Sequence, residues 1–109
     1  AEDEVPFGFV TVGPATDLEQ AGLGEIREWF VSANYQQRGY GRKLLVHGLT
    51  VLKRRMCDSA LIWLPLEVTR PMDVLLQHGF IAYPAQRLVN VGEQASTEQA
   101  YLKDLGDYF

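Results

Sequence analysis

The segment that most constrains the fold is a strand-like run that ends in a turn with two glycines and continues as a helix. Residues 25–32 are rich in aromatic and β-branched side chains, which is typical of a β-strand. Residues 34–41 contain two glycines, which interrupt that strand. From residue 42 leucines recur at helical spacing, so a helix is predicted over 42–56. An apolar run at 60–66 is typical of a buried strand, and the whole unit predicts a crossover between neighbouring strands of a mixed sheet.

The rest of the chain predicts a second helix and further strands. A short helix is expected from Thr69 to Gly79, because Thr69 and Pro71 favour a helix start and Gly79 favours a helix end. Further strands are predicted at 5–12, 80–83 and 88–91. A tail helix is predicted at 96–105, where Ser96 and Gln99 have capping-box spacing. The predicted fold class is therefore α+β, in a single domain that covers residues 1–109.

The charge of the chain limits the partners that it can bind. Ten basic and fourteen acidic residues give a net charge of −4, which argues against nucleic acid, because nucleic-acid-binding domains are basic. Basic residues nevertheless gather in the middle of the chain, namely Arg38, Arg42, Lys43, Lys53, Arg54 and Arg55. A local basic surface on an acidic protein suits a small anionic ligand.

Cysteine content and hydropathy exclude other classes of site. Cys57 is the only cysteine, so the sequence predicts no internal disulfide, no cysteine-based zinc cluster and no metal site. No apolar run is long enough to span a bilayer, and no signal-peptide pattern is present. We therefore expect no membrane partner and a cytoplasmic location.

The turn before the predicted helix has the features of an anion site. Backbone N–H groups at a helix N-terminus attract anions. Gly39 and Gly41 allow close approach of a phosphate and positive φ angles. Arg38, Arg42 and Lys43 add positive charge, so the natural occupant is a diphosphate. The alternative is a structural turn whose glycine pair binds nothing.

These residues resemble the cofactor motif of the GNAT superfamily of N-acetyltransferases. The motif Gln/Arg-x-x-Gly-x-Gly/Ala is filled by Gln36, Gly39 and Gly41, and residues 25–41 resemble the histone acetyltransferase branch. A second family signature, a Gly-Phe pair after the next helix, is matched by Gly79-Phe80. The resemblance covers roughly residues 5–91. It implies a GNAT-like central mixed, mostly antiparallel sheet flanked by helices, without the usual N-terminal strand and helices.

The resemblance also implies a function and a cofactor. The chain would be an acetyl-CoA-dependent N-acetyltransferase that moves an acetyl group to a primary amine on a small molecule or a protein. The strands at 25–32 and 60–66 would splay apart to admit the pantetheine arm, and the amides of the turn would hold the pyrophosphate. The residues implied in cofactor binding are Phe30, Val31, Ser32, Gln36, Gln37, Arg38, Gly39, Tyr40, Gly41 and Arg42.

Two glutamates are candidates for the general base, because in this family the amine loses a proton, commonly to a carboxylate, before it attacks the thioester. Glu25 lies eleven residues before Gln36, which is the spacing of the base in the histone-acetylating branch, and Glu28 lies eight before it. Strict alternation would put the two carboxylates on opposite faces of a strand, unless a β-bulge intervenes. Glu25 is favoured over Glu28. For either one, the alternative is a solvated strand carboxylate.

The sequence departs from the family at one position with a chemical role. Leu75 stands where a Tyr often protonates the leaving thiolate, so Tyr40, Tyr35 or solvent would have to do so. A non-catalytic acyl-CoA-binding or regulatory module is therefore an alternative to the enzyme, and an interaction domain without a ligand is a third. An open sheet edge favours pairing with a second chain, which allows a homodimer.

Overall fold

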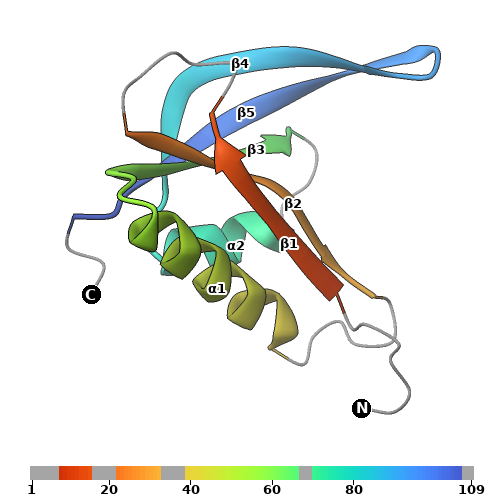
Figure 1. Cartoon of the computed structure of the whole chain (residues 1–109). Coiled ribbons are helices and arrows are strands. Elements are labelled where there is room, and N and C mark those ends of the chain that lie inside the picture. Colours follow the sequence, from red (N-terminus) through yellow and green to blue (C-terminus); the bar gives the residue numbers. More distant parts are fainter. Residues whose placement is uncertain (1–7, 16–21, 33–38, 67–69, 107–109) are drawn as a thin grey trace.

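The computed structural model describes residues 8–15, 22–32, 39–66 and 70–106. Figure 1 shows the elements in chain order. They are β1 (Gly8–Pro14), β2 (Leu23–Val31), α1 (Tyr40–Arg54), β3 (Ser59–Pro65), α2 (Arg70–Gln77), β4 (Ile81–Val91) and β5 (Gln94–Asp104). The predicted strand–turn–helix–strand unit is therefore present as β2, α1 and β3.

The strands form one five-stranded sheet in the order β1-β2-β3-β5-β4 (Figure 1). β2 and β3 are parallel, whereas the other three neighbouring pairs are antiparallel. The predicted mixed, mostly antiparallel sheet with flanking helices is thus confirmed. Within the described residues β1 and β4 are the two edge strands of this sheet.

Both helices pack against the same face of the sheet. Leu45, Leu49 and Leu52 recur at helical spacing on α1 and are buried in one cluster with Leu75 of α2. Residues of β2, β3 and β5 complete this cluster, including Ile26, Ala60, Ile62, Leu64 and Tyr101. We call this side of the sheet the helix face. Neither helix in the described part of the chain is long and apolar enough to cross a membrane.

The opposite side of the sheet, which we call the outer face, carries a second apolar cluster. It contains Leu61 and Trp63, which alternate along β3 with the residues of the helix face. Leu23 and Ala100 belong to the same cluster. β3 is therefore buried on both faces, which explains why its sequence is a continuous apolar run.

The C-terminal segment differs from the prediction. The tail helix predicted at 96–105 is wrong, because residues 94–104 form strand β5 between β3 and β4. Gln99 does not act in a helix cap, since its side-chain amide donates to the carbonyl oxygens of Tyr83 and Ala85 on β4. Pairing with a strand on each side satisfies the backbone of this segment and outweighs a local capping pattern.

The hairpin partner of β5 also differs in detail. The sequence predicted separate strands at 80–83 and 88–91, whereas β4 runs continuously from Ile81 to Val91. Its register with β5 shifts between Tyr83 and Gln86, around Pro84. Pro84 has no N–H to give to the ladder, and such a bulge in an edge strand accommodates it.

Candidate functional site

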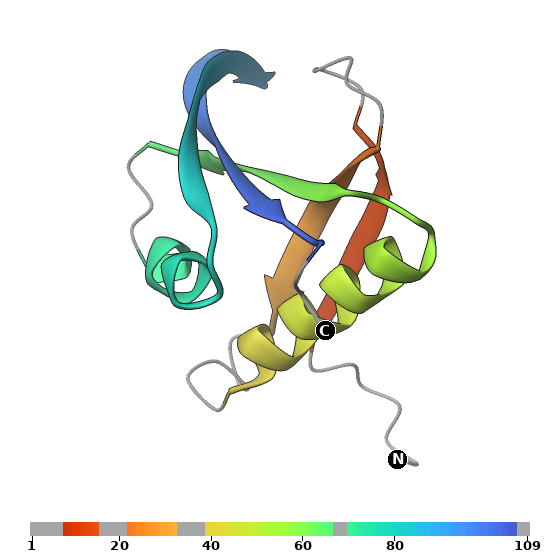
Figure 2. The same cartoon turned by 90° about the vertical axis from the view of Figure 1, so that its left-hand side faces the viewer.

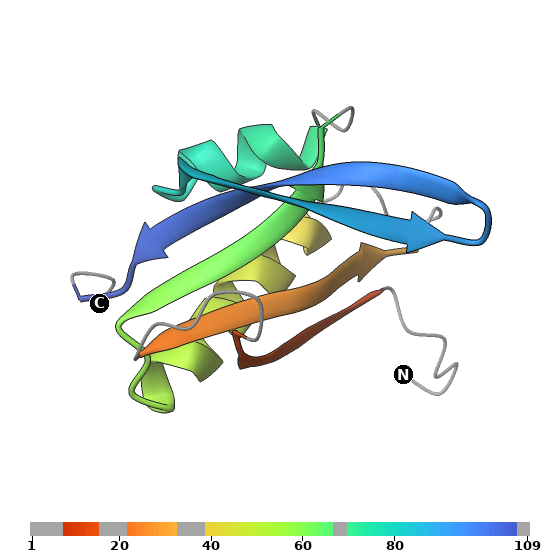
Figure 3. The same cartoon turned by 90° about the horizontal axis from the view of Figure 1, so that it is seen from above.

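The two central strands diverge, as the resemblance to the family implied for the strands at 25–32 and 60–66. β2 pairs with β3 only from Leu23 to Ile26, opposite Ser59 to Ile62. Beyond these residues β2 continues along β1, and β3 continues along β5. Figures 2 and 3 show the two strands spreading apart, with the start of α1 next to the open end.

A β-bulge lies at the start of this divergence. Thr11 pairs with Glu28 and Val12 pairs with Ile26, so Arg27 is an extra residue in β2. The bulge changes the alternation of the strand. Ile26 belongs to the helix face, and Trp29, only three residues later, packs against the same cluster.

The bulge puts the two candidate carboxylates on the same face. Gly24 and Ile26 lie on the helix face, because a Cβ on Gly24 would meet Leu52 and Ile26 is in the helix-face cluster. Glu25 between them therefore points to the outer face. Glu28 lies on the outer face as well, where its Oε1 accepts a hydrogen bond from Thr11 Oγ1 at 3.3 Å.

The two carboxylates differ in exposure. Glu25 is 4% exposed and pairs with Leu61, one pair before β2 and β3 separate, and it is the buried charged residue of the described core. Glu28 is exposed and lies just past the point where β3 leaves β2. The structure thus places both candidate carboxylates on the outer face near the point where β2 and β3 separate. Glu25 is buried there and Glu28 is at the surface.

The start of α1 has the geometry of an anion site. Gly39 is the N-cap, with φ of 84°, and no side chain caps the helix. The first intrahelical bond runs from the N–H of Lys43 to the carbonyl of Gly39, so the N–H groups before it point out of the helix start. A Cβ on Gly39 would meet no atom within 4 Å, and the first turn carries no acidic residue. Space, donors and the helix dipole all suit a diphosphate there.

Gly41 has a different role from Gly39. It lies inside the first turn of α1, and a Cβ there would come to 3.6 Å from Val31 Cγ2. Its carbonyl accepts a hydrogen bond of 2.9 Å from Nε1 of Trp29. The predicted positive φ is confirmed at Gly39 but not at Gly41. A Cβ on Gly41 would thus make only ordinary contacts with the end of β2.

The basic residues of the sequence are divided between the two ends of α1. Arg42 and Lys43 lie in the first turn, where Arg42 donates to Oε1 of Gln77 and Nζ of Lys43 lies 5.5 Å from the centre of the Tyr40 ring. Lys53 and Arg54 lie in the last turn, about 16 Å further along the helix axis. Only the first group can contribute charge to the anion site.

The remaining predicted residues include some that the structure does not describe. Gln36, Gln37 and Arg38 lie outside the described residues, as does Tyr35. Leu75, at the position of the expected Tyr, is fully buried in the helix-face cluster, where it has no proton to give. Among the described tyrosines, Tyr40 lies in the first turn of α1, beside the anion site.

Two features of the site were not predicted from the sequence. The bond from Trp29 to Gly41 was missed because it depends on the bulge, which reverses the face of Trp29. Phe9 and Phe30 form an exposed aromatic pair across β1 and β2. Alternation within 5–12 and 25–32 contained the signal for this pair, but only the register between the strands brings the two rings together.

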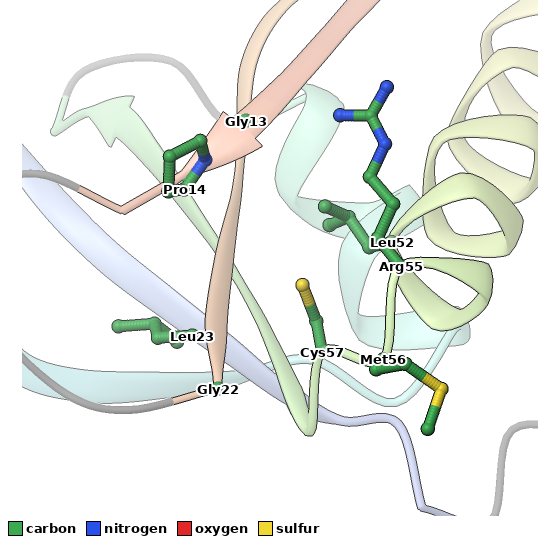
Figure 4. A pocket seen from close by; sticks show the side chains of 8 residues that line it. All are labelled: Gly13, Pro14, Gly22, Leu23, Leu52, Arg55, Met56 and Cys57. Atoms are coloured by element: carbon green, nitrogen blue, oxygen red, sulfur yellow. The ribbon is translucent and has the colours of Figure 1, made fainter.

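A cavity of about 300 Å³ lies at the opposite end of α1 (Figure 4). Its lining residues are Gly13, Pro14, Gly22, Leu23, Leu52, Arg55, Met56 and Cys57. It is thus distant from the start of α1 and from the diverging ends of β2 and β3, and it is not part of the candidate site.

Solved structures share this fold. The ribosomal-protein-alanine N-acetyltransferase of Brucella melitensis is 16% identical, with a TM-score of 0.77 over 90% of this chain and 61% of its own. The IAA acetyltransferase of Bacillus cereus is 13% identical, with a TM-score of 0.66 over 80% of this chain and 65% of its own. The NatC complex bound to Gag peptide and CoA is 17% identical, with a TM-score of 0.70 over 93% of this chain and 62% of that one.

The chain thus spans less than two thirds of the length of these structures. No protein with a curated description matches the sequence. The profile of the acetyltransferase (GNAT) family, whose cofactor is acetyl-CoA, matches residues 1–80. With the diverging central strands beside an open helix start, this match shows that the chain belongs to the GNAT family of acetyltransferases.

Proposed function

We propose that the protein is an acetyl-CoA-dependent N-acetyltransferase that transfers an acetyl group to a primary amine. The observation that carries this proposal is that the N-terminus of α1, which has no side-chain cap, lies beside the point where β3 separates from β2. Acetyl-CoA supplies the acetyl group as a reactive thioester. The residues of this chain bind the cofactor, orient the amine and accept its proton.

Two parts of the chain would bind the cofactor, namely the first turn of α1 and the end of β2. The amides of the first turn of α1 would hold the pyrophosphate, with Gly39 leaving space for it and Arg42 and Lys43 adding charge. Phe30, Val31 and Ser32 lie beyond the last pairing of β2 with β3. Their backbone groups do not pair with β3, and they would instead align the pantetheine arm.

The amine would lose its proton to a carboxylate on the outer face. Glu25 remains the favoured base, because it lies on the outer face next to the point where β2 and β3 separate. Glu28 is the alternative, since the bulge brings it to the same face. Tyr40 or solvent would protonate the leaving thiolate, because Leu75 is buried in the core.

Calorimetry with CoA, together with an assay for free thiol released from acetyl-CoA in the presence of simple primary amines, tests this function. We expect CoA to bind at micromolar to millimolar strength and thiol release to depend on the amine. Absence of both heat and thermal shift at millimolar CoA would refute the cofactor site. Binding of CoA without amine-dependent release would instead indicate a non-catalytic acyl-CoA-binding module.

A further inference from the structure

The outer face carries an aromatic pair directly beside the surface carboxylate. Phe9 and Phe30 are cross-strand partners, with ring centres 5.6 Å apart and planes tilted by 38°. Val10 lies on the helix face, where its Cγ2 would meet a Cβ on Gly48, so Phe9 points outward. Phe30 points outward for the same reason, because Trp29 and Val31 contact the start of α1.

The pair is exposed to a degree that the packing of the sheet does not explain. Phe9 is 45% exposed and Phe30 is 52% exposed. A single exposed apolar side chain is ordinary, but two adjacent rings form a continuous apolar surface. Aromatic rings pack favourably against one another, so this surface suits an aromatic ligand.

Negative charge lies next to this surface. Thr11 and Glu28 are the next outer-face pair along β1 and β2, and they are hydrogen-bonded to each other. Within the described part of the chain Glu28 is in no salt bridge, and Arg27 donates instead to the carbonyl of Pro14. An exposed carboxylate that is in no salt bridge complements an ammonium group, although Arg27 lies on the same face.

The distance between Glu28 and the two phenylalanines indicates the size of a ligand that could contact all three side chains. Glu28 and Phe30 are two residues apart on one strand, which corresponds to roughly 7 Å along the sheet. One ligand can therefore place a primary ammonium group beside Glu28 and an aromatic ring on Phe9 and Phe30. A short alkyl chain would join the two groups of that ligand. Two rings provide contact area for one ring-sized group, which favours a small molecule over a long peptide.

We propose that Phe9, Phe30 and Glu28 form the acceptor site and select small arylalkylamines, that is, primary amines with an aromatic ring on a short alkyl chain. This inference rests on the proposed function, because it names the substrate class of the same site. The amine would lie beside the diverging ends of β2 and β3, and its ring would shield the two phenylalanine rings from water.

Steady-state kinetics with two amines test the selection. We expect kcat/KM for phenethylamine to exceed that for ethylamine on the order of tenfold, since an aromatic contact of this kind is of that strength. In Phe9→Ala this preference should fall to near unity while CoA affinity is unchanged. Leu88→Ala is the matched control, because Leu88 is 67% exposed on β4, far along the sheet from Phe9, and should keep the preference.

A binding measurement separates this inference from the proposed function. Titration with phenethylamine should shift the ring resonances of both Phe9 and Phe30 in NMR spectra, and ethylamine should not. The inference is overturned if the rings do not shift, if the parent shows no preference, or if Phe9→Ala retains it. A strong preference for a peptide that begins with Phe over phenethylamine would also overturn it. Failure of CoA to bind would refute the proposed function, and the ring shifts would still report on the amine site.

Discussion

Trp29 Nε1, near the diverging end of β2, donates a hydrogen bond of 2.9 Å to the carbonyl oxygen of Gly41 in the first turn of α1. This bond joins the strand proposed to align the pantetheine arm to the helix start proposed to hold the pyrophosphate. It holds the two halves of the candidate cofactor site at a fixed distance. The bond exists because the bulge at Arg27 turns Trp29 toward the helix face.

Trp29→Phe removes this bond while keeping an aromatic ring. We expect the free energy of unfolding to fall by about 0.5–1.5 kcal/mol, which is the usual net contribution of one hydrogen bond. CoA affinity should fall as well, because the helix start is no longer held against β2. Urea denaturation and calorimetry measure the two effects. Trp63→Phe is a useful comparison for stability, since Nε1 of Trp63 has no hydrogen-bond partner among the described residues.

The open space at Gly39 leads to a prediction based on charge. Asn and Asp both tolerate a positive φ, so Gly39→Asn and Gly39→Asp should fold alike. The carboxylate would face the pyrophosphate, and we expect Gly39→Asp to bind CoA at least about tenfold more weakly than Gly39→Asn. Calorimetry at low salt checks this. Equal affinities in the two variants would mean that the turn does not hold the pyrophosphate.

The two carboxylates can be distinguished kinetically. Glu25→Gln should lower the rate by ~10²–10⁴-fold, as loss of a general base does, with little effect on CoA binding. The loss should shrink at high pH, because more of the amine is then already deprotonated. Glu28→Gln is the matched variant on the same face, and we expect it mainly to raise KM for the amine. The reverse pattern would make Glu28 the base, and full activity in the double variant would exclude both.

The division of basic residues between the ends of α1 gives a salt-dependent prediction. Arg42→Gln and Lys43→Gln should each weaken CoA binding about threefold to tenfold at low salt, and less at high salt, where the charges are screened. Arg54→Gln changes the net charge equally but lies at the far end of the helix. It should leave CoA affinity nearly unchanged. Equal effects from all three variants would indicate a general effect of net charge.

The local elements of this fold could be read from the sequence because their signals are short-range. Leucines at helical spacing predicted a helix over 42–56, and α1 runs from Tyr40 to Arg54. The apolar run at 60–66 predicted β3, which runs from Ser59 to Pro65. Glycine in the turn predicted a positive φ, which Gly39 adopts. Periodicity and turn chemistry act over a few residues, so a single sequence contains them.

The tertiary structure alone decided the features that depend on distant partners. Residues 96–105 have a capping pattern, yet they form a strand because β3 and β4 lie on either side of them. Glu25 and Glu28 share a face only because β1 pairs with β2 in a register that makes Arg27 a bulge. The same register joins Phe9 to Phe30. Strand pairing is a contact between segments far apart in sequence, and its register follows from the packing of the whole sheet rather than from any one segment.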